Sequence, residues 1–240
     1  GYKFNENQIL SFHGRNDDHK ETGGNKTYKI NFTQLLGRLK LGATHSTGLK
    51  NASLYELYGN IGQKNINPEK SETNEIFGEY SLFENIKLFS TAYRTRMKDR
   101  IKINSSWNAY ENKVPDTTQE GLENEIKWLG NNQSVSLVSH FAKSRTATGG
   151  PNSRRPDLSY GVDYSKKLNS SQYGPFDLNI SHRYIGDHID WTGSKNEFVK
   201  SVDLVDMSIR KNFFGNVLSL NFTNLLNERY EKPGTYSQDG

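Results

Sequence analysis

The segment Val217–Thr223 alternates strictly between apolar and polar side chains. Its apolar set is Leu218, Leu220 and Phe222, and its polar set is Ser219, Asn221 and Thr223. A period of two residues is that of a β-strand with one apolar and one polar face. A single strand leaves both rows of backbone hydrogen-bonding groups unpaired, so this segment requires neighbouring strands.

The same alternation recurs along the chain and is clearest in Leu158–Ser165. About eleven strands are expected and no helix has a convincing period. The expected strands are 8–15, 28–33, 39–44, 75–81, 86–96, 117–128, 134–145, 158–165, 178–184, 199–211 and 217–223. Within 199–211 the apolar face changes between Leu204 and Val205, which predicts a β-bulge there.

The connections between these strands are of two kinds that take turns along the chain. Short turns near 5–7, 36–38, 83–85, 130–132, 169–173 and 214–216 alternate with long polar stretches at 16–25, 48–73, 97–116, 146–153 and 186–196. In an up-and-down meander this places every short turn at one end. The pattern predicts an all-β, antiparallel up-and-down transmembrane β-barrel. A soluble β-sandwich, such as a carbohydrate-binding module, or a propeller remains the alternative.

The composition agrees with a sheet that has one apolar and one wet face. Only 32% of the 240 residues are hydrophobic, yet 12% are aromatic, which argues against disorder. The net charge of +4 comes from dispersed residues, so no nucleic-acid partner is expected. The absence of cysteine excludes disulfides and thiolate metal sites. The opening GYKFNENQIL has no signal-peptide pattern and has the character of interior sequence.

Two segments resemble the TonB-dependent outer-membrane receptors. Ser53–Ser71 resembles the family's S-L-Y-E-L-Y-G run followed by N-P-x-L-x-P-E-x-S, although the first proline is absent here. Asn224–Tyr230 (NLLNERY) resembles the family's N-L-F-D-x-x-Y box. Weaker similarities lie at Thr118–Glu123, at Arg155-Pro156 and at 184–187. The matching positions are Ser53, Leu54, Tyr55, Glu56, Leu57, Tyr58, Gly59, Asn67, Pro68, Glu69, Asn224, Leu225 and Tyr230.

The resemblance implies a 22-stranded barrel plugged by an N-terminal domain that interacts with TonB. Residues 1–240 would form the C-terminal part of that barrel, with the plug domain and the final strand outside the segment. The implied function is energy-coupled import of a ferric siderophore or cobalamin, and the spacing is most similar to the cobalamin receptors. The implied location is the outer membrane of a Gram-negative bacterium, in contact with its lipid and lipopolysaccharide. No cofactor is implied.

The sequence offers no recognisable catalytic or metal-ligating constellation. It lacks G-x-S-x-G, P-loop and G-x-G-x-x-G motifs, and its six histidines are isolated, so no catalytic residue or metal ligand is predicted. Four histidines (His13, His45, His140 and His182) lie in expected strands, where a polar face accounts for them. Acidic pairs at Asp17-Asp18 and Asp187/Asp190 suit solvated loops better than Ca²⁺ sites. A barrel-borne outer-membrane enzyme remains a second alternative.

Aromatic and basic residues in the long connections are the candidate ligand contacts. Large rings there are able to pack on a bulky ligand. The aromatic candidates are Tyr55, Tyr58, Trp107, Tyr110 and Trp191, for which an aromatic girdle or loop packing is the alternative. The basic candidates are Arg154 and Arg155, with Lys20, for an anionic ligand or lipopolysaccharide, with ordinary solvation as the alternative.

Overall fold

A computed structural model describes residues 1–19, 23–112, 116–146, 150, 154–191, 196–232 and 236–238. The chain is built almost entirely from strands, with one short helix. The elements are β1 (Tyr2–Asn5), β2 (Gln8–His19), β3 (Gly23–Leu36), β4 (Leu39–Lys50), α1 (Leu54–Tyr58), β5 (Glu69–Phe83), β6 (Ile86–Lys98), β7 (Lys102–Ile103), β8 (Tyr110–Glu111), β9 (Thr117–Leu129), β10 (Gln133–Thr146), β11 (Leu158–Ser170), β12 (Gly174–Ile185), β13 (His188–Trp191), β14 (Asn196–Val199), β15 (Val202–Phe213), β16 (Asn216–Phe222), β17 (Tyr230–Lys232) and β18 (Tyr236–Gln238).

Twelve strands pair in the order β1-β2-β3-β4-β5-β6-β9-β10-β11-β12-β15-β16, which is the order of the chain. The pairs β7–β8, β13–β14 and β17–β18 form separate two-stranded sheets. The chain divides into two compact units, one of residues 1–78, 91–121 and 143–151 and the other of residues 79–90, 122–142 and 152–240. This sequential antiparallel pairing is that of an up-and-down meander and not that of a Greek-key β-sandwich.

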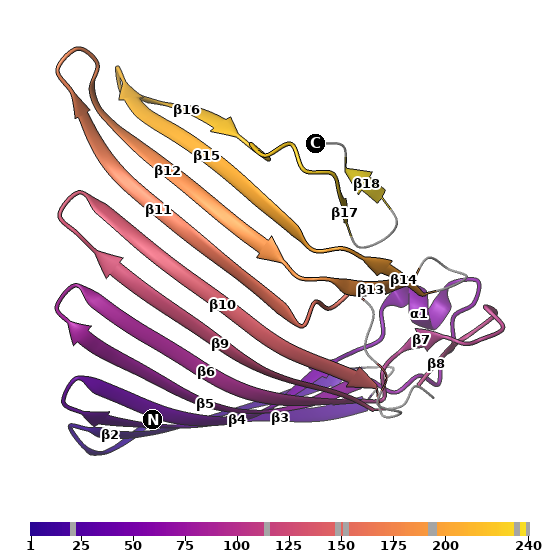
Figure 1. Ribbon diagram of the computed structural model, residues 1–240. Coiled ribbons are helices and arrows are strands. Elements are labelled where there is room, and N and C mark those ends of the chain that lie inside the picture. Colours follow the sequence, from indigo (N-terminus) through magenta and orange to yellow (C-terminus); the bar gives the residue numbers. More distant parts are fainter. Residues whose placement is uncertain are drawn as a thin grey trace. The chain divides into compact units, whose positions relative to one another are not determined.

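In the second unit, cross-strand register sorts side chains onto two different faces. Strands β11, β12, β15 and β16 lie side by side (Figure 1). One row runs across five strands as Val135, Tyr164, Ile180, Met207 and Phe222, and it defines the apolar face of this unit. The adjacent row, on the opposite or polar face, is Ser134, Ser165, Asn179, Ser208 and Asn221. The predicted alternation at Val217–Thr223 is thereby confirmed.

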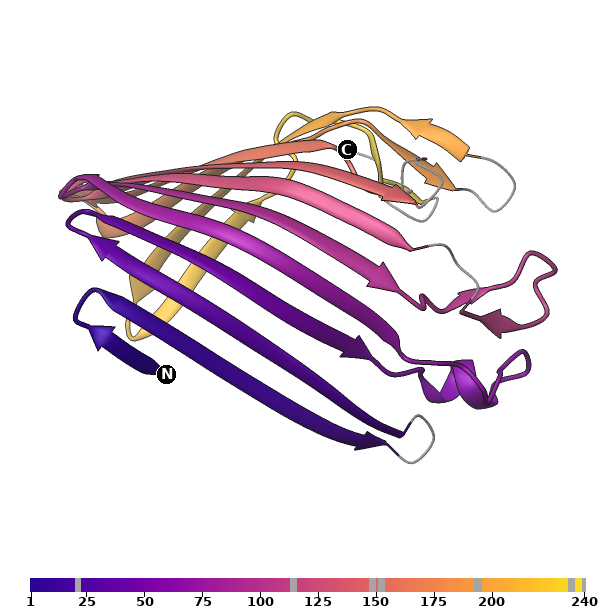
Figure 2. The same cartoon turned by 90° about the horizontal axis from the view of Figure 1, so that it is seen from below.

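The first unit repeats this division on β2, β3 and β4, which lie side by side at the indigo end of the chain (Figure 2). Leu10, Phe32 and Ala43 form a row on its apolar face. The neighbouring row on its polar face is Ser11, Asn31 and Thr44, in which the Thr44 hydroxyl donates to Asn31 Oδ1 at 2.9 Å. Phe12, on the apolar face, is 65% exposed, so this face is open to its surroundings.

Backbone hydrogen bonds place neighbouring short turns next to each other. In the second unit, Leu129 N–H donates to Asn85 O at 2.9 Å and Lys167 N–H donates to Asn132 O at 2.7 Å. The Lys211 ammonium donates to Tyr173 O in the next pair of turns. These contacts join the turns that follow β5, β9 and β11 to one another or to the adjoining parts of β11 and β15, which agrees with short turns at one end of the strands.

The strands are longer than the alternation predicts. The stretch expected as a loop at 16–25 continues the β2–β3 ladder up to the pair His19↔Gly23, because backbone pairing does not require apolar side chains. The expected long connections at 97–116 and 186–196 contain the small hairpins β7–β8 and β13–β14. With β1 counted, the main sheet has twelve strands and not eleven.

The bulge predicted at Leu204 and Val205 is absent from the β12–β15 ladder. Its register runs without interruption from Asp177↔Arg210 to Ile185↔Val202. Val202 and Leu204, which are buried, lie on one face of β15, and Val205 lies on the other. In the sequence, these apolar residues on both faces look like a change of the apolar face at a bulge. No helix in the described ranges is long and apolar enough to cross a membrane.

Candidate ligand-binding loops and polar face

The resembling segment at 53–59 folds into α1, a helix that the alternation did not predict. Ser53 caps its N-terminus: the Ser53 hydroxyl accepts from Glu56 N–H at 3.2 Å, and Glu56 Oε2 accepts from Ser53 N–H at 2.7 Å. This reciprocal capping box satisfies two backbone donors that a helix start otherwise leaves open. Leu54 and Tyr58 are the first and last residues of the helix, and Gly59 caps its C-terminus. The motif therefore encodes local structure.

The helix rests on a small core in the first unit. Leu57 is 2% exposed and packs with Ala52, Ile66 and Ile101, while Tyr110 packs against this cluster from β8. Burial of a leucine side chain contributes roughly 1.5–3 kcal/mol. Packing on this cluster therefore stabilises α1, because so short a helix is not stable by itself. We call α1 and the cluster beneath it the platform.

Hydrogen bonds connect the remaining residues of the motif, Asn67 and Glu69, to residues around this platform. Asn112 Nδ2 donates to Asn67 O at 2.9 Å, and Asn67 N–H donates to Asn112 Oδ1 at 2.7 Å. Pro68 is buried beside them. Glu69 Oε1 accepts from Ile101 N–H at 3.0 Å and from the Lys50 ammonium at 3.2 Å. Asn112 was not singled out from sequence, because a lone loop asparagine carries no signal of its partner.

The Glu56 carboxylate is stabilised in its charged form. Burial is the largest single influence and raises its pKa, but the hydrogen bonds from Ser53 N–H and the Ser53 hydroxyl and the charge of Lys50 outweigh it. The pKa of Glu56 therefore lies below its usual value. The Lys50 ammonium is 4.0 Å from Glu56 Oε1.

Four of the five aromatic candidates lie on this platform or on the adjoining β7–β8 hairpin. The Tyr55 and Tyr110 rings meet edge to face with centroids 6.2 Å apart. Tyr55 is 61% exposed and Tyr58 48% exposed, and the Lys64 ammonium lies 5.4 Å from the centroid of the Tyr58 ring. Trp107, at the tip of the hairpin, is 59% exposed with a φ of 57°. The platform thus presents three exposed rings and one partly buried one.

The basic candidates Arg154 and Arg155 belong to the second unit and differ from each other. Arg154 Nε donates to Asp190 Oδ1 at 2.5 Å, and the Asp190 side chain is only 6% exposed. Arg154 N–H also donates to Ile189 O at 2.7 Å. The expectation that Asp190 is a solvated loop acid is wrong, because it is buried against this guanidinium. Arg155 is exposed. The side chain of Trp191, like the whole of Lys20, lies outside the described residues.

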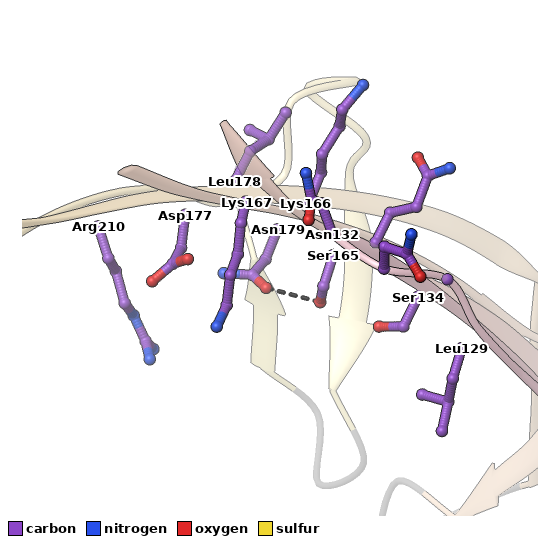
Figure 3. A pocket seen from close by; sticks show the side chains of 13 residues that line it. Leu129, Asn132, Ser134, Ser165, Lys166, Lys167, Asp177, Leu178, Asn179 and Arg210 are labelled. Carbon is purple, nitrogen blue, oxygen red and sulfur yellow. Dashed lines mark hydrogen bonds between the residues drawn. The ribbon is translucent and has the colours of Figure 1, made fainter. Parts of the chain in front are cut away.

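A cavity of about 370 Å³ lies near the short turns of the second unit. Figure 3 shows its side chains on both sides of the sheet, with the Ser165 hydroxyl donating to Asn179 Oδ1 at 2.7 Å. Asn179 Nδ2 in turn donates to Ser208 Oγ at 3.3 Å. The row next to it on the polar face is Lys167, Asp177 and Arg210. The polar face is consequently a hydrogen-bonded surface with charges of both signs.

The C-terminal box also has a structural role. Asn224 adopts a φ of 51°, its Oδ1 accepts from Glu228 N–H at 3.0 Å and its Nδ2 donates to Glu228 O at 2.9 Å. Asp206 Oδ1 accepts from Asn224 N–H at 2.8 Å, and Arg183 donates to the other Asp206 oxygen. Leu225 N–H donates to Val205 O, and Tyr230 begins β17. The box therefore anchors the chain to β15.

The weaker similarity at Thr118–Glu123 also has a physical cause. A Cβ built on Gly121 would lie 2.6 Å from the Tyr93 ring, so only glycine leaves room for the ring on the neighbouring strand. Gln119 Nε2 donates to the Tyr93 hydroxyl at 3.1 Å. An aromatic ring covering a strand glycine is a known device of β-sheets.

Several of the isolated histidines and acids have polar partners among the described residues. His45 and His182, expected on a polar face, lie on the apolar face, where His45 pairs with Ile30 and His182 with Val205. His182 Nε2 is 2.7 Å from Asp203 Oδ1. Asp17 pairs with Arg15 in β2, at 2.6 Å from its Nη2. Within the described ranges, no group of three or more His, Cys, Asp or Glu side chains is arranged to hold a metal ion.

A family model described as the β-barrel of TonB-dependent-receptor-like proteins matches residues 1–225. The chain belongs to the TonB-dependent receptor family. The vitamin B12 transporter BtuB of Vibrio cholerae serotype O1 is 24% identical over 230 residues, which cover 92% of this chain and 36% of that transporter. The segment thus spans about a third of the length of this curated relative.

Solved structures of siderophore receptors have the same fold. The siderophore receptor PirA of Acinetobacter baumannii superposes with a TM-score of 0.79 at 17% identity, over 97% of this chain and 43% of that one. A ferric enterobactin receptor (PfeA) mutant of Pseudomonas aeruginosa gives 0.77 at 20% identity, over 99% and 42% of the two chains. The predicted all-β, up-and-down barrel architecture is confirmed by these matches, and the soluble β-sandwich is excluded.

Proposed function

We propose that this TonB-dependent receptor segment is part of an outer-membrane importer that takes up cobalamin or a ferric siderophore. The match of residues 1–225 to the family's barrel carries the proposal. In the proposed protein a plug domain precedes the segment and contacts TonB, and a further strand follows it. Strands beyond β1 and β16 would complete a 22-stranded barrel in a Gram-negative outer membrane, in contact with lipid and lipopolysaccharide.

The two faces of the sheet support this placement. A row such as Val135, Tyr164, Ile180, Met207 and Phe222 suits hydrocarbon, whereas the polar row beside it suits a water-filled interior. Leu218, at 57% exposure, and Phe222, at 43%, are costly to leave in water over so large a surface. The apolar face is therefore assigned to lipid and the polar face to the lumen.

The exposed rings of the platform are the proposed ligand contacts. Tyr55, Tyr58 and Trp107 are available to stack on a corrin or an aromatic siderophore, with the Tyr110 ring packed edge to face against Tyr55. Arg155 is proposed as the residue that attracts an anionic ligand, since Arg154 is already bound to Asp190. Trp191 remains a candidate from its position in β13. No catalytic residue and no cofactor enter this proposal.

An uptake experiment tests the proposal. Cells with and without the full-length receptor that carries this segment are given radiolabelled vitamin B12 or ⁵⁵Fe-loaded siderophore. Each comparison is made in strains with and without a functional TonB. We expect one of the two ligand classes to enter only when receptor and TonB are both present. Uptake that is independent of TonB, or no uptake of either class, contradicts the proposal.

A further inference from the structure

A small group of polar side chains lies within the second unit on the neighbouring strands β6, β9 and β10 (Figure 1). The Ser90 hydroxyl donates to Asn124 Oδ1 at 2.8 Å, and Asn124 Nδ2 donates to Ser139 Oγ at 3.2 Å. Asn124 therefore bridges two serines on the strands at either side of it. We call Ser90, Asn124 and Ser139 the Ser-Asn-Ser cluster.

Strand register places this cluster on the apolar face of the unit. Ser139 pairs with Tyr160 of β11, and Tyr160 lies four residues from Tyr164, a member of the apolar row. Side chains an even number of residues apart on a strand share one face, so Ser139 belongs to the apolar face. Asn124 and Ser90 belong to it as well, because the two hydrogen bonds join them to Ser139.

Large apolar side chains flank the cluster along its strands. By the two-residue period, its neighbours on the same face are Leu88 on β6, Leu122 and Ile126 on β9, and Leu137 and Phe141 on β10. The four on β9 and β10 are 39% to 48% exposed. Apolar residues thus lie on both sides of Asn124 and of Ser139, so the cluster is inside the band assigned to lipid and not at its edge.

The hydrogen-bonding capacity of the cluster is only partly used. An asparagine amide has two N–H donors and an oxygen with two lone pairs. Among the described residues, the Asn124 nitrogen and oxygen make one hydrogen bond each, so one N–H and one lone pair remain open. Hydrocarbon offers no partner to such groups. Polar side chains at membrane depth form hydrogen bonds between transmembrane segments, and this cluster has the composition for such a contact.

We infer that the Ser-Asn-Ser cluster is the centre of a contact between two copies of this receptor in the plane of the membrane. The assignment rests on the proposed function, since it requires the apolar face to meet lipid. Two copies in one membrane have the same orientation, so a two-fold axis along the membrane normal places identical residues opposite each other at equal depth. The Asn124 amide is both a donor and an acceptor, so two of them complement each other across that axis.

Resonance energy transfer between donor- and acceptor-labelled copies of the full-length receptor in phospholipid vesicles tests this contact, as added lipid dilutes the protein. Asn124→Leu removes the amide and leaves an apolar side chain on the lipid face, so folding into bilayers is retained. Asn179→Leu is the matched control, because Asn179 bridges Ser165 and Ser208 in the same way on the polar face. At about threefold for each hydrogen bond within a membrane, we expect Asn124→Leu to weaken the dimer about tenfold and the control to leave its dissociation constant unchanged.

Cross-linking then locates the contact on the apolar face. A short bifunctional maleimide should join two copies that carry Leu122→Cys, which lies beside Asn124 on β9, in a receptor without other cysteines. It should not join copies that carry Leu218→Cys, which lies on the apolar face of β16. Equal cross-linking at the two positions contradicts a contact centred on the cluster.

Three further results overturn the inference: no energy transfer in the wild type, equal dissociation constants for the wild type and Asn124→Leu, or a different protein in place of the second copy when the receptor is purified from its membrane. Ligand uptake is measured in parallel. If the wild type imports its ligand as a monomer, the dimer contact fails while the proposed function stands. If the wild type neither folds in bilayers nor imports, the proposed function fails with it.

Discussion

Ile180 offers the sharpest test of which face meets lipid. It lies four residues from Phe176 and four from Tyr184, the outermost aromatic residues on the apolar face of β12, which also carries His182. At about 3.4 Å per residue and a tilt of about 40°, each end is roughly 10 Å away in height, so Ile180 lies near the middle of a ~25 Å band. An arginine at the bilayer midplane on the lipid face costs roughly 2–4 kcal/mol.

The adjacent position supplies a matched control. Ser181 lies on the polar face between Asp163 and Asp206, so an arginine there meets two carboxylates. We therefore expect Ile180→Arg to lower the bilayer folding equilibrium of the full-length receptor about 30- to 1,000-fold, and Ser181→Arg to lower it much less. Urea titration of refolding into phospholipid vesicles, followed by tryptophan fluorescence, measures both. Equal losses, or a larger loss for Ser181→Arg, would refute the assignment of the faces.

Three further changes test single features of the first unit. Gly121→Val places a side chain where the Tyr93 ring lies and should destabilise the receptor by about 1–3 kcal/mol; an unchanged urea midpoint contradicts the close approach. Leu57→Ala opens a cavity under α1, and we expect faster proteolysis near the helix, consistent with a local loss of about 2–4 kcal/mol; unchanged cleavage rates refute the platform. Because the pKa of Glu56 is lowered in the folded state, its stabilising effect is present above about pH 4.5 and is lost as pH falls through the folded pKa. The protection factor of the Ser53 amide against hydrogen exchange, taken relative to its intrinsic rate at each pH, should therefore fall on acidification in wild type but change little in Glu56→Gln, and identical profiles exclude the carboxylate as the cause.

Side-chain alternation predicts the faces of this sheet better than it predicts the lengths of its strands. The rows through Ile180 and Asn179 follow directly from the period of two, because one face is apolar and the other is polar. The ends of β2 and β3 are polar on both faces, and there the backbone ladder continues without any signature in the side chains. Apolar residues on both faces of β15 produced the opposite error, a predicted bulge that the ladder lacks.

The candidate site was predictable only in part. Five residues of helix are too few for a helical period, yet the pair Ser53 and Glu56 is the sequence signature of a capping box and was available as a signal. The partner of Arg154 was not predictable, because Asp190 is 36 residues distant and reaches it through the β13–β14 hairpin. Contacts made by loops depend on tertiary packing, which has no period along the chain.

The sequential order of the main sheet has an evolutionary consequence. Every strand of the twelve is paired with neighbours that come next to it along the chain, apart from the small hairpins set between them. Loss or duplication of one hairpin would remove or add two strands. The side chains of all the other strands would still lie on the same faces of the sheet as before. A sheet with this order is therefore able to gain or lose strands in steps of two, and a long connection is gained or lost together with its hairpin as a single genetic event.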